Sequence, residues 1–121
     1  MDTPVLDLSY LTSISGNDSK YMYEVINLFL STVPDGLKKL EQLVKNTDDF
    51  EGIHRQAHSL KSSFSIIKVG DIFDDIAAIV ILGREARGKE EIDQRLDNVL
   101  ATFEAAMPVI TAERDRHKAR K

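Results

Sequence analysis

Two histidines, a lysine and a serine line one side of the segment around position 58. His54 and His58 are four residues apart, and Lys61 and Ser65 follow at spacings of three and four. Residues at such spacings share one side of a helix, here a flank of the apolar seam. A neutral imidazole offers a nitrogen lone pair, and an ammonium group can hold phosphoryl oxygens. Position 58 thus meets the conditions for nucleophilic attack on a phosphoryl group, and Lys61 could assist electrostatically.

The side chains next to His58 are small, which leaves room for a bulky partner to reach the ring. Ser62 lies four residues after His58, and Ser59 is its immediate neighbour. We expect Ser62 or Ser65 to donate a hydrogen bond to a phosphoryl oxygen. His54 has a supporting position: it either steers His58 from one turn away or simply occupies the helix flank.

A partner that exchanges a phosphoryl group must cover the helix flank that carries His54, His58, Lys61 and Ser65. Apolar side chains at the edge of this flank are therefore candidate docking residues. When the helix is projected at about 100° per residue, Ile66 points away from the side that faces the core. Leu11 and Ile14 belong to an apolar segment near the N-terminus. We predict docking at Ile66, with Leu11 and Ile14 as weaker candidates.

A metal site is an alternative interpretation of the two histidines. His54 and His58 have the spacing of helix-borne zinc ligands. Two ligands do not complete a site, however, and position 55 is Arg where a zinc protease motif has Glu. Lys61 would also repel a cation. Metal binding is therefore the lesser alternative, beside a helical bundle that binds partners without being phosphorylated.

Apolar residues recur at three- and four-residue spacings through most of the chain, which is typical of amphipathic helices. Alternating strand patterns are absent, and Pro34 is expected to bend the helix that contains it. The expected helices are a short N-terminal one at 5–14 and long ones at 18–46, 48–68, 71–87 and 89–115. Short connections favour antiparallel neighbours. The sequence predicts one all-α domain over residues 1–121, an antiparallel up-and-down four-helix bundle with a short N-terminal helical lid.

The composition argues against several classes of protein. The 121 residues suit one domain, and the lack of Cys excludes disulfide and thiolate chemistry. A net charge of −4, no Trp and few aromatic residues argue against a nucleic-acid partner. No apolar run is long enough to span a membrane, and the N-terminus lacks the pattern of a secretory signal. We expect a cytoplasmic monomer that contacts neither nucleic acid nor membrane.

The C-terminal stretch from Arg114 to Lys121 is basic and includes His117. Cations at the end of a helix complement its dipole and need no further role. We expect His117 to be solvated there.

The string from His54 to Phe64 resembles the signature of the histidine-containing phosphotransfer (HPt) domains of multistep two-component signalling. The family pattern is approximately Ala-His-x-Leu-Lys-Gly, which Ala57, His58, Leu60 and Lys61 match. Two departures stand out. Ser62 replaces the glycine after the lysine, which costs some clearance for a partner. The third long helix ends Leu82-Gly83-Arg84-Glu85 in place of Leu-Glu, a change not expected to touch the site.

The resemblance implies a carrier, not an independent enzyme. His58 would accept a phosphoryl group from an aspartate of a response-regulator receiver domain and pass it to another receiver, with Lys61 in the family's lysine role. The implied partners are receiver domains and a hybrid histidine kinase. The resemblance places Mg²⁺ on the receiver, so no cofactor is expected on this chain.

Overall fold

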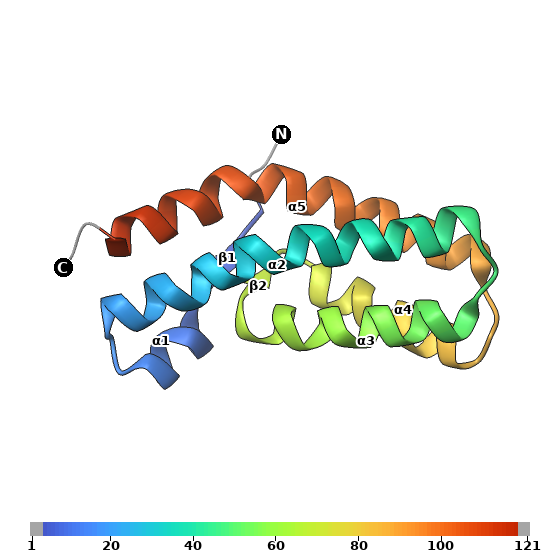
Figure 1. The fold of residues 1–121 in the computed structure, drawn as a ribbon, viewed down its shortest axis with the longest axis horizontal. Helices are drawn as coiled ribbons and strands as arrows, with labels where there is room; N and C mark the ends of the chain where they lie inside the picture. The colour runs from blue at the N-terminus through green and yellow to red at the C-terminus, as the bar shows by residue number, and fades with distance from the viewer. Residues whose placement is uncertain (1–3, 119–121) are drawn as a thin grey trace.

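The computed structural model describes residues 4–118, and the expected all-α fold class is confirmed (Figure 1). Five helices hold most of the described residues, and one two-stranded sheet accompanies them. The elements in chain order are β1 (Leu6–Asp7), α1 (Ser9–Ser15), α2 (Ser19–Asn46), α3 (Phe50–Ile66), β2 (Lys68–Val69), α4 (Ile72–Arg84) and α5 (Lys89–Lys118).

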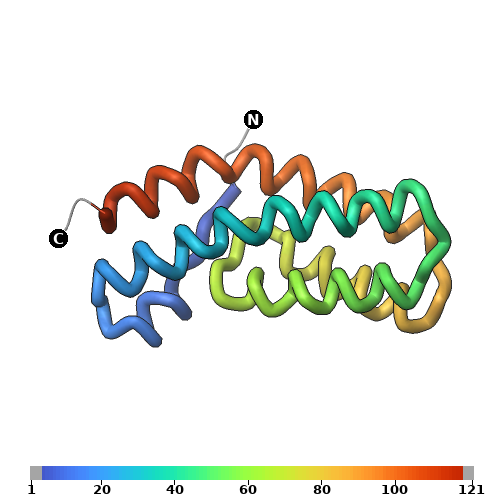
Figure 2. Tube along the Cα trace, viewed as in Figure 1, coloured from blue at the N-terminus to red at the C-terminus, as the bar shows by residue number. Residues whose placement is uncertain are grey.

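The four longer helices surround a common apolar core. Helix α2 packs against α3 and α5, and α4 packs against α3 and α5 in turn. Figure 2 shows successive long helices running in opposite directions, with α1 beside the first turns of α2. The rings of Phe29, Phe64 and Phe103 meet in the core, with centroids 5.4–6.2 Å apart. These rings join α2, α3 and α5 through edge and tilted contacts.

Side-chain caps determine where α2 and α3 begin. The Asp18 carboxylate accepts hydrogen bonds from the backbone N–H groups of Lys20 and Tyr21, so α2 begins at Ser19. Asp49 accepts from the N–H of Gly52 in the same way. Helix α3 therefore begins two residues later than the expected 48–68 range. Pro34 lies inside α2, which continues through it.

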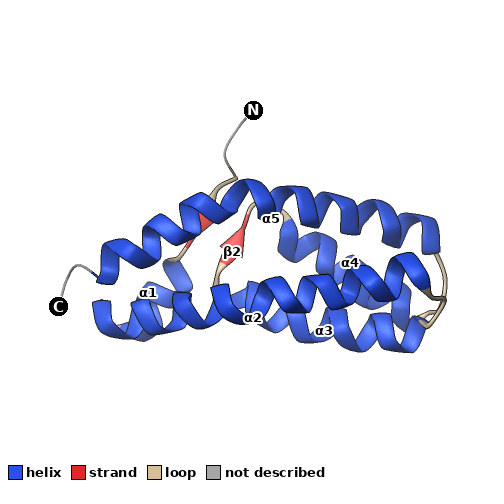
Figure 3. Cartoon of the chain, turned by 45° about the horizontal axis from the view of Figure 1, so that its top comes forward, coloured by secondary structure: helices blue, strands red, loops and turns tan. Residues whose placement is uncertain are grey.

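The N-terminal segment differs from the single helix expected at 5–14. Residues 6–7 pair antiparallel with residues 68–69, in the register Leu6↔Val69 and Asp7↔Lys68 (Figure 3). The Gly70 N–H also donates to the Val5 carbonyl at 2.8 Å. This pairing ends α3 before residue 68 and delays α1 to Ser9. Two-residue strands are too short to show alternation, so the sequence pattern does not reveal them.

The expectation of a solvated His117 is wrong. Helix α5 extends to Lys118, and the His117 side chain is only 6% exposed. Its Nδ1 lies 3.2 Å from the Ser19 hydroxyl oxygen, because the last turn of α5 lies beside the first turn of α2. Residues 119–121 of the basic stretch lie outside the described residues.

Helices α3 and α4 approach each other most closely at Gly83. A Cβ atom added there would lie 3.0 Å from the backbone nitrogen of His54 and 3.1 Å from its Cα. Since backbone cannot move aside as a side chain can, this contact requires glycine. The expectation that the Gly83 departure leaves the site untouched is therefore wrong: Gly83 packs on the helix that carries His58.

We predict that Gly83→Ala destabilises the protein by about 1–3 kcal/mol despite its higher helix propensity, because the added methyl group forces α4 off α3. Urea denaturation measures the change. Gly36→Ala in α2 is the matched control, since its Cβ would meet side-chain atoms and no backbone: Cδ2 of Leu60 at 3.0 Å and Nε2 of Gln56 at 3.4 Å. It should cost clearly less. Equal losses in both variants would contradict the proposed close contact.

An ion-pair cluster joins the end of α2 to the start of α5. The Lys45 ammonium donates to Asp93 at 2.5 Å and to Asp97 at 2.8 Å. These hydrogen bonds, that to Asp93 first, raise the pKa of Lys45 above its ordinary value. The lysine side chain is 34% exposed, so solvent screens the pairs and limits their contribution.

We predict that Lys45→Met lowers the free energy of unfolding by less than about 1 kcal/mol at pH 7. A raised pKa in the folded state stabilises the fold below the unfolded pKa of about 10.4, and this contribution is lost as pH rises through the folded pKa. The two proteins should therefore converge in strongly alkaline urea titrations. A difference that persists undiminished there would contradict the assignment.

Candidate functional site

His58 lies near the middle of α3 and its side chain is exposed. Its ring makes no hydrogen bond within the described part of the chain, and its centroid lies 6.2 Å from that of His54. The same helix turns Ile53, Ala57 and Leu60 into the core. A fixed helix thus presents an imidazole with both nitrogens uncommitted.

His54 is half-buried and its orientation is fixed. Its Nδ1 lies 2.9 Å from the carbonyl oxygen of Val80 on α4. A carbonyl only accepts hydrogen bonds, so Nδ1 must be the donor. The sequence indicated a histidine flank here, but nothing in it pointed to the Val80 carbonyl.

Lys61 is half-buried and shares an aromatic contact with a second lysine. Its Nζ lies 5.9 Å from the ring centroid of Phe73 on α4, and the Nζ of Lys68 lies 5.4 Å from the same centroid. Neither lysine forms an ion pair with any described residue. Lys68 lies opposite Asp7 in the strand pair. Hydrogen bonds from Ser9, and after them the charge of Lys68, lower the pKa of the Asp7 carboxyl. Lys61 is therefore the cation more available to an anion near α3. Phe73 and Lys68 did not emerge from the sequence, because only folding brings β2 and α4 beside Lys61.

The two serines differ in their availability. Ser62 is exposed, and its hydroxyl makes no hydrogen bond to another described residue. The Ser65 hydroxyl donates to the Ser62 carbonyl at 2.6 Å. That bond uses the only proton of the Ser65 hydroxyl, so Ser65 is not a free donor for a phosphoryl oxygen.

The expected docking residues also differ from one another. Leu11 is fully buried at 0% exposure and belongs to the core, so its proposed role at the surface is wrong. Its short helix packs on α2 and turns Leu11 inward. Ile14, on the same helix, is 47% exposed. Ile66 is half-buried and packs partly on the core.

Ile66 lies at a small hollow between α2 and α3. The neighbouring wall comes from α2 and includes Val25, Leu28 and Thr32. Leu28 is 62% exposed, an unusual position for a large apolar side chain. Sequence reasoning missed Leu28. The signal was present, because Leu28 is an apolar residue that does not lie on the side of the helix that Phe29 and Val33 turn into the core.

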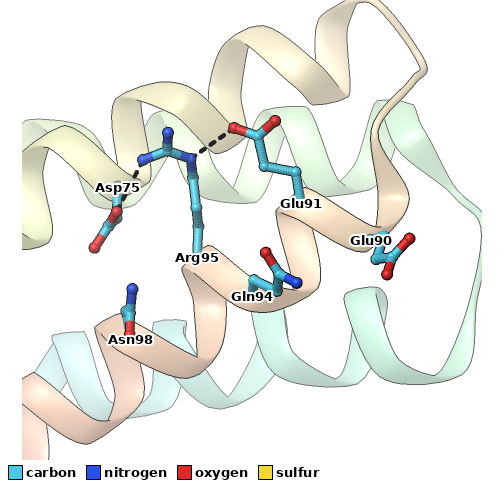
Figure 4. Close-up of a pocket in the computed structure, with 6 residues that line it drawn as sticks. All are labelled: Asp75, Glu90, Glu91, Gln94, Arg95 and Asn98. Carbon is cyan, nitrogen blue, oxygen red and sulfur yellow. Dashed lines mark hydrogen bonds and ion pairs between the residues drawn. The ribbon is translucent and has the colours of Figure 1, made fainter.

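A separate polar hollow between α4 and α5 holds none of the residues discussed above. Arg95 lies at its centre and donates to Glu91 at 2.9 Å and to Asp75 at 3.0 Å (Figure 4). The bond to Glu91 is the main cause that raises the pKa of Arg95. The two carboxylates offset the charge of Arg95, and its bond to Asp75 connects α5 to α4.

Residues 4–118 contain no group of three or more His, Cys, Asp or Glu side chains placed to hold a metal ion. The alternative of a metal site at His54 and His58 gains no further ligand from the fold. No helix in this range has the length and apolar character needed to cross a membrane.

Comparison with known proteins adds one finding. A family model described as the Hpt domain matches residues 24–106. The matched range includes all of α3 and α4 and most of α2 and α5. No curated protein and no solved structure matches the chain significantly.

Proposed function

The chain belongs to the Hpt domain family, and on that premise we propose that it is a phosphorelay carrier with His58 as its acceptor. Hpt domains are phosphotransfer modules of two-component signalling. The observation that carries the assignment is the exposed His58 ring, with both nitrogens free, within the Ala57–Lys61 match to the family signature.

The transfer is a simple displacement at phosphorus. The lone pair of a His58 ring nitrogen attacks the phosphorus of an aspartyl phosphate on a receiver domain. The N–P bond forms while the P–O bond breaks, and the electron pair leaves with the aspartyl carboxylate. The second ring nitrogen keeps its proton, so positive charge develops on the imidazole. The reverse step delivers the phosphoryl group to the aspartate of another receiver.

Lys61 supports this chemistry as a positive charge one turn from His58. Its ammonium is held above Phe73 without an acidic partner among the described residues, so it can turn toward phosphoryl oxygens. The exposed Ser62 hydroxyl is the available serine donor. We assign the Mg²⁺ that assists transfer to the receiver, as the family resemblance implies, and no cofactor to this chain.

The proposed partners are receiver domains and a hybrid histidine kinase. We place part of their docking surface at the apolar hollow formed by Leu28 of α2 and Ile66 of α3, because Ile66 lies on the same helix as His58. Burial of Leu28 in a complex would remove a large exposed apolar side chain from water.

We predict that His58→Gln abolishes labelling by a phosphorylated receiver domain, because glutamine has no nucleophilic nitrogen. The measurement is retention of acid-labile, alkali-stable phosphate on the protein. His54→Gln is the control and should keep most of the label. Label that persists on His58→Gln would assign the acceptor elsewhere. A wild-type protein that no receiver labels would favour a bundle that binds partners without phosphorylation.

We predict that Ile66→Glu slows phosphotransfer at least about tenfold, since a carboxylate would be buried in the apolar contact. The decrease should appear at low receiver concentration in a rapid-quench assay. Ile81→Glu, at an exposed isoleucine of α4 outside this hollow, is the matched control. Unchanged rates in Ile66→Glu would place docking elsewhere.

A further inference from the structure

The two nitrogens of His54 have different roles in the structure. Nδ1 is held by the Val80 carbonyl at 2.9 Å and carries a proton in both the neutral and the cationic ring. In the neutral ring Nε2 is therefore bare. Any change in the charge of His54 must occur by gain or loss of a proton at Nε2.

The His54 ring is also held in place beside the exposed His58 ring. The ring centroids are 6.2 Å apart with an interplanar angle of 42°. The contact of Gly83 with the His54 backbone and the bond to Val80 hold the ring from the α4 side. The distance is short enough for a charge on one ring to act on a group attached to the other.

Few other charged groups compete for His54. On α3, the Glu51 carboxylate lies 3.5 Å from the Arg55 guanidinium, and Lys61 is the next cation. On α4, Arg84 is the charged residue within about one turn of Val80. His54 itself forms no ion pair with any described residue. The ring centroid of His58 lies 6.2 Å from that of His54.

We propose that His54 is a positioning residue that takes up a proton at Nε2 when His58 is phosphorylated. The inference rests on the proposed function. A phosphoryl group brings up to two negative charges beside His54 and favours the imidazolium form. The proton comes from solvent, the Nδ1–H bond to Val80 stays in place, and the cation holds the phosphoryl group. The proton is released when the phosphoryl group leaves.

A switchable charge suits this position better than a permanent one. Positive charge develops on the His58 ring as the N–P bond forms, and a fixed cation at position 54 would oppose it. A neutral His54 permits attack, and a protonated His54 then stabilises the product.

Two substitutions separate the role of Nε2 from the structural hydrogen bond. In His54→Asn the side-chain amide lies near the former Nδ1 position, so it keeps the donor to Val80 and loses Nε2. In His54→Gln the amide nitrogen lies near the former Nε2 position, so it keeps a donor beside His58 and loses the bond to Val80. Thermal melting of both variants checks that each is folded.

The measured quantity is the equilibrium of phosphoryl exchange with a receiver domain, followed from pH 6 to about pH 8.5. We expect His54→Asn to shift this equilibrium about three- to tenfold toward the phosphorylated receiver, and His54→Gln to change it less. The wild-type equilibrium should favour phosphorylated His58 more at lower pH, with a smaller pH dependence in His54→Asn. A purely structural His54 would give the reverse order, with His54→Asn close to wild type.

Nitrogen-15 NMR provides a direct second readout. At pH 7.5 an ordinary imidazole is mostly neutral. We expect the Nε2 resonance of His54 to move to the position of a protonated nitrogen when the protein is phosphorylated. An Nε2 that stays bare in the phosphorylated protein overturns the inference and leaves the carrier function intact. A wild-type protein that accepts no phosphoryl group defeats the carrier function itself.

Discussion

The close crossing of α3 and α4 is the constraint that shapes the surroundings of His58. Glycine at position 83 lets one backbone lie directly on the other. The same approach brings the Val80 carbonyl to the His54 ring, and Phe73 of the same helix meets Lys61. Helix α4 thus orients a side chain on each side of His58, while the His58 ring itself stays exposed.

A single helix meets two opposed requirements. The side chains on its core side, which include Ile53, Ala57 and Phe64, are fully buried, so the backbone of α3 has little freedom to move. Its flank carries the His58 imidazole, which has no hydrogen-bond partner among residues 4–118. The proposed carrier function needs both properties, because the reacting ring must be free to react and must be presented in the same place to each partner.

The helical periodicity predicted most of the helices and placed His54, His58 and Lys61 on one flank of α3. Spacings of three and four indicate which side of α3 is buried. The sequence alone therefore predicts that Leu60 faces the core and that His58 does not. Leu28 was missed for the same reason. A search for residues that face the core passes over apolar residues on the exposed side of a helix.

Features that depend on contacts between distant segments could not be predicted in this way. The burial of Leu11 follows from where α1 packs, and that of His117 follows from the length of α5 beside α2. The pairing of Leu6 with Val69 involves too few residues to leave a pattern. The role of Gly83 is visible only as the absence of a Cβ at a crossing of two helices.

Strand β1, helix α1, the first residues of α2 and the last turns of α5 lie outside the range that the family model matches, whereas β2 lies inside it. Leu11 nevertheless fills part of the common core, and β1 supplies the backbone partner of β2, which directly follows α3. A fragment trimmed to residues 24–106 would lose both of these and the contact between Ser19 and His117. The residues that complete the core and the strand pair therefore extend beyond the range that the family model matches.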